Sequence, residues 1–370
     1  MTVRGTDTDV LVVGGGPVGL AAALECRRAG LDVVVVEPRE GAVDKACGEG
    51  LMPGALALLR SWDVDPPGHV LAGISYRQGP RHADHRFRGA VGRGVRRTTL
   101  HAALAERAAD LGATALHGRV TALRTRPDGT AAAMVQSGRA PGPPEPSADD
   151  AATGTGTAEL TARWVLACDG LHSPVRRLLG LEAAPRHPDA RRRFGLRRHY
   201  RLAPWDDLVE VHWSPSAEAY VTPVAEDLVG VAVLGPRGTD LDATLAELPE
   251  LAARLAGAAA DGPVRGAGPL LQRSRRRSLG PVRLVGDASG YVDALTGEGL
   301  RVGFAQARAA VATLEDPAQY ERAWRAATRD YRLLTSGLVR AATSPVRRAV
   351  VPAAARLPGV YGAVVERLAR

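Results

Sequence analysis

The chain has 370 residues and is 45% apolar, which allows two or three domains with a sizeable core and excludes a disordered, collagen-like or disulfide-stapled protein. The formal net charge is +8, but only 4% of the residues are aromatic and no basic stretch is interleaved with them, so we expect no nucleic-acid partner. No apolar run approaches the length of a membrane span and the opening residues lack the apolar stretch of a signal peptide, so we expect a cytoplasmic protein.

The chain opens with the pattern of a β-α-β unit. Continuous apolar runs at residues 9–13 and 32–37 predict two buried strands of a parallel sheet that is covered on both faces. Residues 17–29 between them predict a helix, which Gly30 ends.

The turn between the first strand and this helix carries a glycine fingerprint. Gly14, Gly16 and Gly19 have the G-x-G-x-x-G spacing, which allows a tight turn, close approach of the backbone to a pyrophosphate, and close packing of helix on strand. Glu37 ends the second strand, where its carboxylate can accept hydrogen bonds from a ribose diol. We therefore predict a dinucleotide site. Its predicted contacts also include Pro17, Val18, Pro38 and Arg39.

The middle of the chain mixes one helix with several strands. Residues 96–111 have the spacing of an amphipathic helix, and residues 119–125 and 130–136 predict strands. Residues 138–157 are rich in proline, glycine and acidic residues, so we expect a surface loop or a disordered hairpin tip. Longer alternating segments from 191 to 234 predict an antiparallel sheet, which we interpret as a substrate lobe.

The final part of the chain predicts one buried strand and then helices. An apolar segment at 282–288 leads into a glycine-rich turn, and the region from Leu300 onward is helical but divided by prolines. From Gly337, apolar residues alternate with arginines, and the only acid is Glu366. Helices that cover the mouth of an active site explain this pattern. The alternative is a basic apolar face that rests on an anionic membrane.

Three segments together carry a family resemblance. The glycine fingerprint, the ACDG sequence that ends at Gly170, and LVGDASGYVDALTGEGLRVGFAQA at 284–307 resemble the superfamily of FAD-dependent monooxygenases and geranylgeranyl reductases, with a para-hydroxybenzoate-hydroxylase-type fold. The resemblance covers essentially the whole chain. It implies an α/β protein with a discontinuous Rossmann-type FAD-binding domain, an antiparallel-sheet substrate domain and C-terminal helices. The implied boundaries are 1–66, 96–182 and 279–312 for the FAD-binding domain, 67–95 and 183–278 for the substrate domain, and 313–370 for the helices.

The resemblance also implies which residues hold FAD. Asp169 and Gly170 close a turn beside the cofactor, and Gly286 and Asp287 hold the ribitol of the flavin. A carboxylate beside glycines can accept bonds from sugar hydroxyls without a side chain blocking the cofactor. Val120 is a further expected contact.

A GEGL sequence and an arginine complete the expected flavin contacts. The backbone N–H groups of GEGL are expected to face the pyrimidine edge of the ring, where a helix N-terminus favours negative charge on reduced flavin. These residues are Gly297, Glu298, Gly299 and Leu300. Arg97 lies where family members place an arginine near the cofactor, and Arg96 is the alternative.

The segment DKACGEGLMPGAL at 44–56 resembles the flavin-facing loop of geranylgeranyl-reductase-like proteins. The expected contacts in this loop are Cys47, Gly48, Glu49 and Gly50. Cys47 has two interpretations, a thiol that contacts or tunes the flavin and a small buried filler. Cys26 and Cys168 are expected to be packing residues, and no cysteine or histidine spacing predicts a metal site.

The EAYVTP sequence at 218–223 stands where flavin-dependent halogenases carry Trp-x-Trp-x-Ile-Pro. Glu218 and Tyr220 replace both tryptophans, so we do not expect halogenation. The Tyr-x-Trp-x-Phe-Pro pattern of geranylgeranyl reductases is only partly matched. We assign Tyr220 and Cys47 as candidate catalytic residues.

The resemblance favours a monooxygenase. NAD(P)H would reduce the FAD, oxygen would form a C4a-hydroperoxide, and one oxygen atom would pass to a small aromatic, polyketide or isoprenoid substrate. No second G-x-G-x-x-G follows a strand, which fits an enzyme in which NAD(P)H reacts transiently with a mobile flavin. The alternatives are a geranylgeranyl-reductase-like enzyme that reduces isoprenoid C=C bonds and a flavoprotein without catalysis. The expected partners are a small-molecule substrate and molecular oxygen, and no oligomeric state is predicted.

Overall fold

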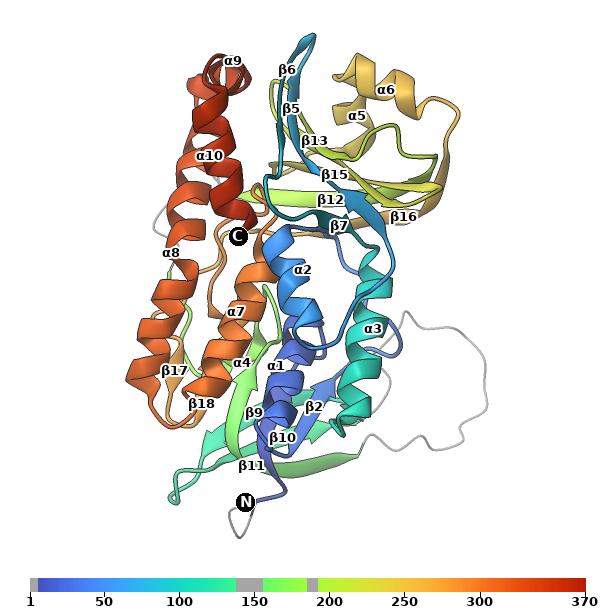
Figure 1. Cartoon of the computed structure of the whole chain (residues 1–370). Helices are drawn as coiled ribbons and strands as arrows, with labels where there is room; N and C mark the ends of the chain where they lie inside the picture. Colours follow the sequence, from blue (N-terminus) through green and yellow to red (C-terminus); the bar gives the residue numbers. More distant parts are fainter. Residues whose placement is uncertain (1–5, 138–155, 185–191) are drawn as a thin grey trace.

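Three sheets and the helices around them organise the chain (Figure 1). The computed structural model describes residues 6–137, 156–184 and 192–370. The eight-stranded sheet has the order β17-β18-β11-β1-β2-β8, and β10 and β9 extend it from β11. Its strands are β1 (Thr8–Val13), β2 (Val33–Glu37), β8 (Thr114–His117), β9 (Arg119–Thr125), β10 (Ala131–Gln136), β11 (Thr157–Ala167), β17 (Ser278–Leu279) and β18 (Val282–Leu284).

The centre of this sheet is parallel, as the apolar runs predicted. β1 pairs with β2 on one side and with β11 on the other, and β18 pairs in parallel with β11. The carboxyl ends of β1, β11 and β18 therefore meet at one edge of the sheet, which is where ligands bind in open α/β folds. Gly14, the Asp169–Gly170 pair and Gly286 come shortly after these three strands, so the topology brings the predicted cofactor motifs together.

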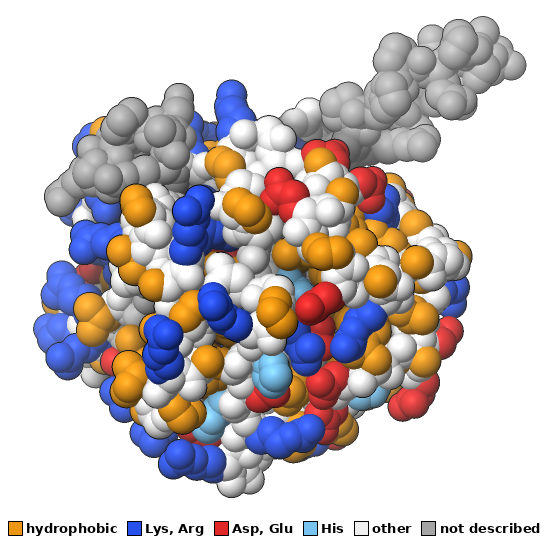
Figure 2. All heavy atoms as spheres, turned by 90° about the horizontal axis from the view of Figure 1, so that it is seen from above, with side chains coloured by type: hydrophobic (Ala, Val, Ile, Leu, Met, Phe, Trp, Pro, Cys, Tyr) orange, Lys and Arg blue, Asp and Glu red, His pale blue; other side chains and the backbone are white. Residues whose placement is uncertain are grey.

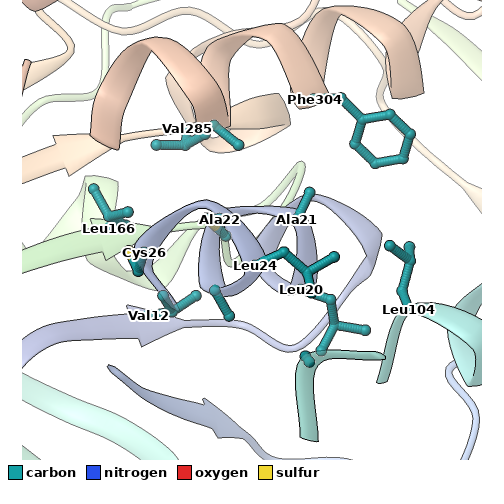
Figure 3. Packing of buried hydrophobic residues seen from close by; sticks show 14 of the residues in the cluster. Val12, Leu20, Ala21, Ala22, Leu24, Cys26, Leu104, Leu166, Val285 and Phe304 are labelled. Atoms are coloured by element: carbon teal, nitrogen blue, oxygen red, sulfur yellow. The ribbon is translucent and has the colours of Figure 1, made fainter. Parts of the chain in front are cut away.

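Helices α1 (Pro17–Arg28), α3 (Arg97–Asp110) and α7 (Gly299–Ala312) build the main hydrophobic core on this sheet. Figure 3 shows Leu20, Leu24 and Cys26 of α1 between β1 and β11 on one side and α7 and α3 on the other. The predicted helices at 17–29 and 96–111 are thereby confirmed. The short helices near this sheet are α2 (Pro53–Arg60), α4 (Pro174–Leu178) and the 3-10 turn η2 (Gly286–Ser289).

The seven-stranded sheet contains the predicted substrate lobe. Its order is β16-β12-β15-β14-β13-β5-β6. The pairs among β12 to β15 are antiparallel. β5, which comes from much earlier in the chain, pairs in parallel with β13, so the sheet is mixed. The elements of this lobe are β5 (Gly73–Gln78), β6 (Arg81–Arg86), β12 (Arg193–Arg201), β13 (Leu208–Trp213), β14 (Glu218–Ala225), β15 (Leu228–Pro236), β16 (Ala259–Ala267), α5 (Leu241–Ala246) and α6 (Pro249–Leu255).

A small sheet and the C-terminal helices join the two larger parts. The three-stranded sheet has the order β3-β7-β4, with β3 (Gly50–Leu51), β4 (His69–Leu71) and β7 (Gly92–Gly94). The final helices are α8 (Pro317–Ala342), η3 (Pro345–Ala349), α9 (Val350–Arg356) and α10 (Pro358–Ala369). Among the described residues, no helix has both the length and the apolarity to cross a bilayer. The end of the molecule that carries α9, β6 and α6 shows many arginine side chains interspersed with apolar ones (Figure 2).

Two expectations have no structural outcome. The polar loop expected at 138–157 lies almost wholly outside the described residues. The domain boundaries, with breaks at residues 66, 95, 182, 278 and 312, stay a prediction.

Candidate cofactor site

The glycine fingerprint forms a turn that only glycine can build. Gly14 has a φ of 103°, and a Cβ there would lie 2.6 Å from the carbonyl oxygen of Cys168. A Cβ on Gly19 would lie 1.8 Å from the carbonyl oxygen of Gly14, so α1 contacts β1 more closely than any side chain allows. A Cβ on Gly16 would have only the Arg97 guanidinium nearby, at 3.9 Å. The turn is therefore closed on the protein side and open at Gly16, where α1 begins.

Glu37 is joined to the same turn. The backbone N–H of Gly15 donates to Oε2 of Glu37 at 2.8 Å, and Nε of Arg39 donates to Oε1 at 2.6 Å. Burial disfavours the charged carboxylate, but these hydrogen bonds outweigh it and hold the pKa of Glu37 below its usual value. Pro38 accepts a hydrogen bond from the ring of His117 at its carbonyl, at 3.2 Å. An ionised Glu37 at this position can still accept from a sugar hydroxyl through its remaining lone pairs.

Two aspartates lie at the ends of neighbouring strands but differ in their surroundings. Oδ2 of Asp169 accepts from the backbone N–H of Val175 at 2.9 Å, so this carboxylate caps α4. Within the described residues, the carboxylate of Asp287 has no hydrogen-bond partner. Burial raises the pKa of Asp287, and the charges of Lys45, Arg97 and Arg176 oppose the rise. Asp287 is therefore the carboxylate with free acceptor capacity at this edge of the sheet.

Lys45 and Arg97 face the same space. Nζ of Lys45 lies 3.3 Å from where a Cβ on Gly170 would stand, and burial together with Arg39 and Arg97 lowers the pKa of Lys45. In the part of the chain that the structure describes, neither the Lys45 ammonium nor the Arg97 guanidinium has a hydrogen-bond or ion-pair partner, and Nε of Arg97 is buried. Two unpaired cations, an exposed lysine and a partly buried arginine, lie beside a glycine turn and form a site for an anionic ligand.

The structure distinguishes Arg96 from Arg97, which the sequence left as alternatives for the arginine near the cofactor. Arg96 pairs with Asp261 through Nη1 at 2.8 Å, whereas Arg97 lies at the start of α3 with its guanidinium near Gly16. Lys45 had not been predicted as a cofactor contact. Its signal in the sequence was that it is the only lysine among 48 basic residues.

The GEGL sequence forms the start of α7. Gly297 has a φ of 70°, and the helix begins at Gly299, next to Leu300. Glu298 is buried and pairs with Arg301, and burial raises the pKa of Glu298 to about 7. The helix N-terminus supplies free backbone N–H groups here.

The loop at residues 44–56, which is predicted to face the flavin, is held in place by Glu49. This residue has a φ of 59°, and its side chain is 3% exposed. Oε1 accepts from the backbone N–H of Arg97 at 2.9 Å, and Oε2 contacts Nε2 of His199 at 2.6 Å. Because Arg197 can only donate, its contact with Nδ1 of His199 at 3.0 Å assigns the ring proton to Nε2. Glu49 thus accepts two donors and ties the loop to both α3 and β12.

The other predicted residues lie around these groups. Cys47 is partly exposed, and its sulfur accepts from the backbone N–H of Glu49 at 3.4 Å, with Gly48 in open space between them. The hydroxyl of Tyr220 donates to the carbonyl of Leu295 at 3.0 Å, just before the GEGL sequence. Val120 is buried in the core beneath the sheet. The structure gives Tyr220 a positioning contact, and its catalytic role stays a prediction.

Comparisons with known proteins show the family of the chain. Residues 7–196, slightly more than half of the chain, match the FAD binding domain family. The chain belongs to this FAD-binding family. A digeranylgeranylglycerophospholipid reductase of Methanopyrus kandleri is 30% identical over 79% of the chain and 76% of that protein. A rifampicin monooxygenase of Rhodococcus hoagii is 32% identical over 48% of the chain and 35% of that protein.

The fold has solved counterparts. A flavoprotein/dehydrogenase of Cytophaga hutchinsonii superposes with a TM-score of 0.82 at 18% identity, covering 98% of the chain and 92% of that protein. The aligned segments span only 12% to 35% of the first curated relatives. The family and the names of the relatives support an FAD-dependent oxidoreductase.

The residues present fit FAD. Gly16, Lys45 and Arg97 would hold the pyrophosphate, Glu37 the adenosine ribose and Asp287 the ribitol. The unpaired state of Lys45 and Arg97 in the protein alone is the observation that favours a doubly negative group between them.

We expect that Lys45→Met weakens FAD binding about tenfold or more, because a charge-assisted contact to the pyrophosphate is lost. The dissociation constant of FAD from the apoprotein, followed by flavin fluorescence at several salt concentrations, measures the effect. Removing this charge should also reduce the salt dependence of binding. Arg81→Met, at an exposed arginine of β6, is the control and should change neither quantity. An affinity unchanged by Lys45→Met would contradict the assignment.

Thiol labelling should distinguish the three cysteines. Cys26 and Cys168 are buried, and burial raises the pKa of both thiols, so we expect only Cys47 to react with an aromatic disulfide reagent in the folded protein. Bound FAD should slow the reaction several-fold if the loop faces the flavin. Cys47→Ala should abolish the fast phase. Equal labelling rates with and without FAD would place this thiol away from the cofactor.

Proposed function

We propose that the chain is an FAD-dependent, NAD(P)H-using monooxygenase that hydroxylates or epoxidises a small aromatic, polyketide or isoprenoid substrate with molecular oxygen. The observation that carries the FAD assignment is the pair of unpartnered cations, Lys45 and Arg97, beside Asp287 and the glycine turn. The reaction type is supported by relatives that are named monooxygenases, such as the one acting on rifampicin. NAD(P)H and oxygen together supply the two electrons and the oxygen atom, and water is the second product.

The chain's own residues bind, orient and exclude water. FAD supplies the redox chemistry and the reaction with oxygen. The start of α7 would offer backbone N–H groups to negative charge on a bound flavin ring. Behind this turn, Trp213 and Tyr220 of the substrate sheet pack with Leu295 in one buried apolar cluster, which keeps water out of this region. The carbonyl of Leu295 is held by the Tyr220 hydroxyl, which positions the turn before Gly297.

The test is an anaerobic one. The purified protein is reduced with NADH or NADPH, oxygenated buffer is added, and the absorption spectrum is recorded by stopped flow with and without candidate substrates. We expect reduction by a nicotinamide and a transient near-ultraviolet band before the oxidised spectrum returns. Direct reoxidation without such a band, in every substrate tested, would contradict monooxygenation.

A second candidate function is reduction of isoprenoid C=C bonds. It is favoured by the reductase from Methanopyrus kandleri, whose alignment covers 79% of the chain, and by the position of Cys47 in the loop tied to Arg97 and β12. Under this alternative, the dithionite-reduced protein would saturate a prenyl alkene without oxygen, consuming two electrons and two protons per double bond. A protein that binds FAD but shows neither reaction would be a flavoprotein without catalysis.

A further inference from the structure

The turns that join the last helices expose large apolar side chains. Val346 in η3 is 60% exposed, Leu357 between α9 and α10 is 56% exposed, and Val360 in the first turn of α10 is 61% exposed. Single exposed apolar residues are ordinary, but here three of them follow one another at the junctions of η3, α9 and α10. We call these three residues, together with Arg348 and Arg356, the C-terminal tip.

The charge of this region has one sign. No aspartate or glutamate occurs between Asp330 and Glu366. Arg348 and Arg356 are exposed, and neither has an ion-pair partner among the described residues. In the view onto this end of the molecule, the side of α8 to α10 shows arginine and apolar side chains, while most acidic side chains lie on the opposite side (Figure 2). The tip therefore offers apolar and positively charged groups together.

The tip is held rigidly by buried contacts. Arg347, next to Arg348, is buried and pairs with Glu218 of β14, and its Nε donates to the carbonyl of Ser214 at 2.8 Å. Val351 at the start of α9 is fully buried, and the hydroxyl of Tyr361 in α10 donates to the carbonyl of Ile74 at 3.1 Å. The exposed side chains are thus presented on a fixed support, which limits the entropy lost when they become buried.

The other end of α10 reaches the flavin-facing loop. Ala369 packs in one cluster with Met52 and Leu71, and backbone atoms of Arg370 lie beside Gly54. A partner surface that contacts the C-terminal tip would therefore lie about the length of α10 from the loop that carries Cys47. This helix has 12 residues, about 18 Å.

We propose that the C-terminal tip docks on the surface of an anionic lipid bilayer. Val346, Leu357 and Val360 enter the boundary between headgroups and acyl chains, and Arg348 and Arg356 contact lipid phosphates. The combination of short aliphatic side chains, unpaired arginines and absent acids matches this occupant. A nucleic acid would favour stacking aromatics, and the tip has none. The proposal does not depend on the reaction that the enzyme catalyses.

The test is flotation of the FAD-loaded protein with vesicles of phosphatidylcholine alone and of phosphatidylcholine with about 30% phosphatidylglycerol. We expect binding to the anionic vesicles and at least about tenfold weaker binding to the neutral ones. The double variant Leu357→Asp/Val360→Asp should lose anionic-vesicle binding by about tenfold or more, because both the apolar contact and the charge match are removed. Arg348→Ser/Arg356→Ser should weaken it by about fivefold per arginine.

The matched control is Val70→Asp/Val264→Asp, which places the same charges at exposed valines of β4 and β16. It should bind vesicles more strongly than the tip variant. FAD content and the melting temperature report that each variant is folded. Absence of wild-type binding to anionic vesicles would overturn the proposal. A second result would also overturn it: Arg348→Ser/Arg356→Ser loses vesicle binding while Leu357→Asp/Val360→Asp keeps it. That result indicates that a basic protein adsorbs to any polyanion.

Discussion

Replacing Gly19 with alanine is expected to yield a protein that retains almost no FAD and unfolds at a lower temperature. The new Cβ would stand 1.8 Å from the carbonyl oxygen of Gly14 and 3.3 Å from Cβ of Cys168. Because the new Cβ would clash with backbone atoms of Gly14, no flexible side chain can move aside. α1 must therefore move away from β1, and the turn must open. Overpacking of a core costs about 1–3 kcal/mol and more where backbone has to shift. FAD per chain after gel filtration and a thermal melt measure both effects.

Gly337→Ala is the matched control for this substitution. Gly337 lies within α8, and a Cβ there would meet nothing within 4 Å. Alanine should therefore leave FAD content unchanged and raise stability slightly, by about 0.5–1 kcal/mol. A Gly19→Ala protein with full FAD content would show that the close contact of α1 with β1 is not needed for the cofactor.

Replacing Glu49 with alanine is expected to produce the second large effect. Glu49 and His199 are both almost fully buried, and Glu49 accepts one hydrogen bond from this ring and another from the backbone N–H of Arg97. Removing the carboxylate leaves two buried N–H donors without an acceptor, and each costs about 1–3 kcal/mol. We expect a loop that no longer holds its position, a fall in FAD affinity of at least about tenfold, and a lower free energy of unfolding.

Two variants make this result specific. Glu49→Gln should also weaken FAD binding. The carboxylate offers an acceptor oxygen to each of its two N–H donors, whereas the amide NH2 of glutamine would face one of these donors. Glu315→Ala removes an ion pair with Arg163 in which the glutamate is 78% exposed, so it should change stability by less than about 1 kcal/mol. If Glu49→Gln behaved as the wild type in FAD titration and chemical denaturation, the two-donor arrangement at this carboxylate would be wrong.

The features that the sequence predicted well are local ones. The strands at residues 9–13 and 32–37 are apolar on both faces, and the glycines between them are required by contacts within one β-α-β unit. The unpredicted features depend on distant partners. The parallel pairing of β5 with β13 leaves no periodic signature in either strand. Lys45 became a candidate only when folding placed it over Gly170, and the direction of the Glu49 side chain depends on His199.

The order of strands in the eight-stranded sheet has a consequence for synthesis. β11 lies between β1 and β18, and the residues of β18 follow those of β11 by more than a hundred positions. A ribosome that adds about 5–20 residues per second exposes the outer edge of β11 for roughly 6–23 s before its partner strand emerges. This edge includes Val165 and Leu166, and an apolar unpaired edge recruits other chains. Slower growth at low temperature or added chaperone should therefore raise the soluble yield of this protein without any change in its folded stability.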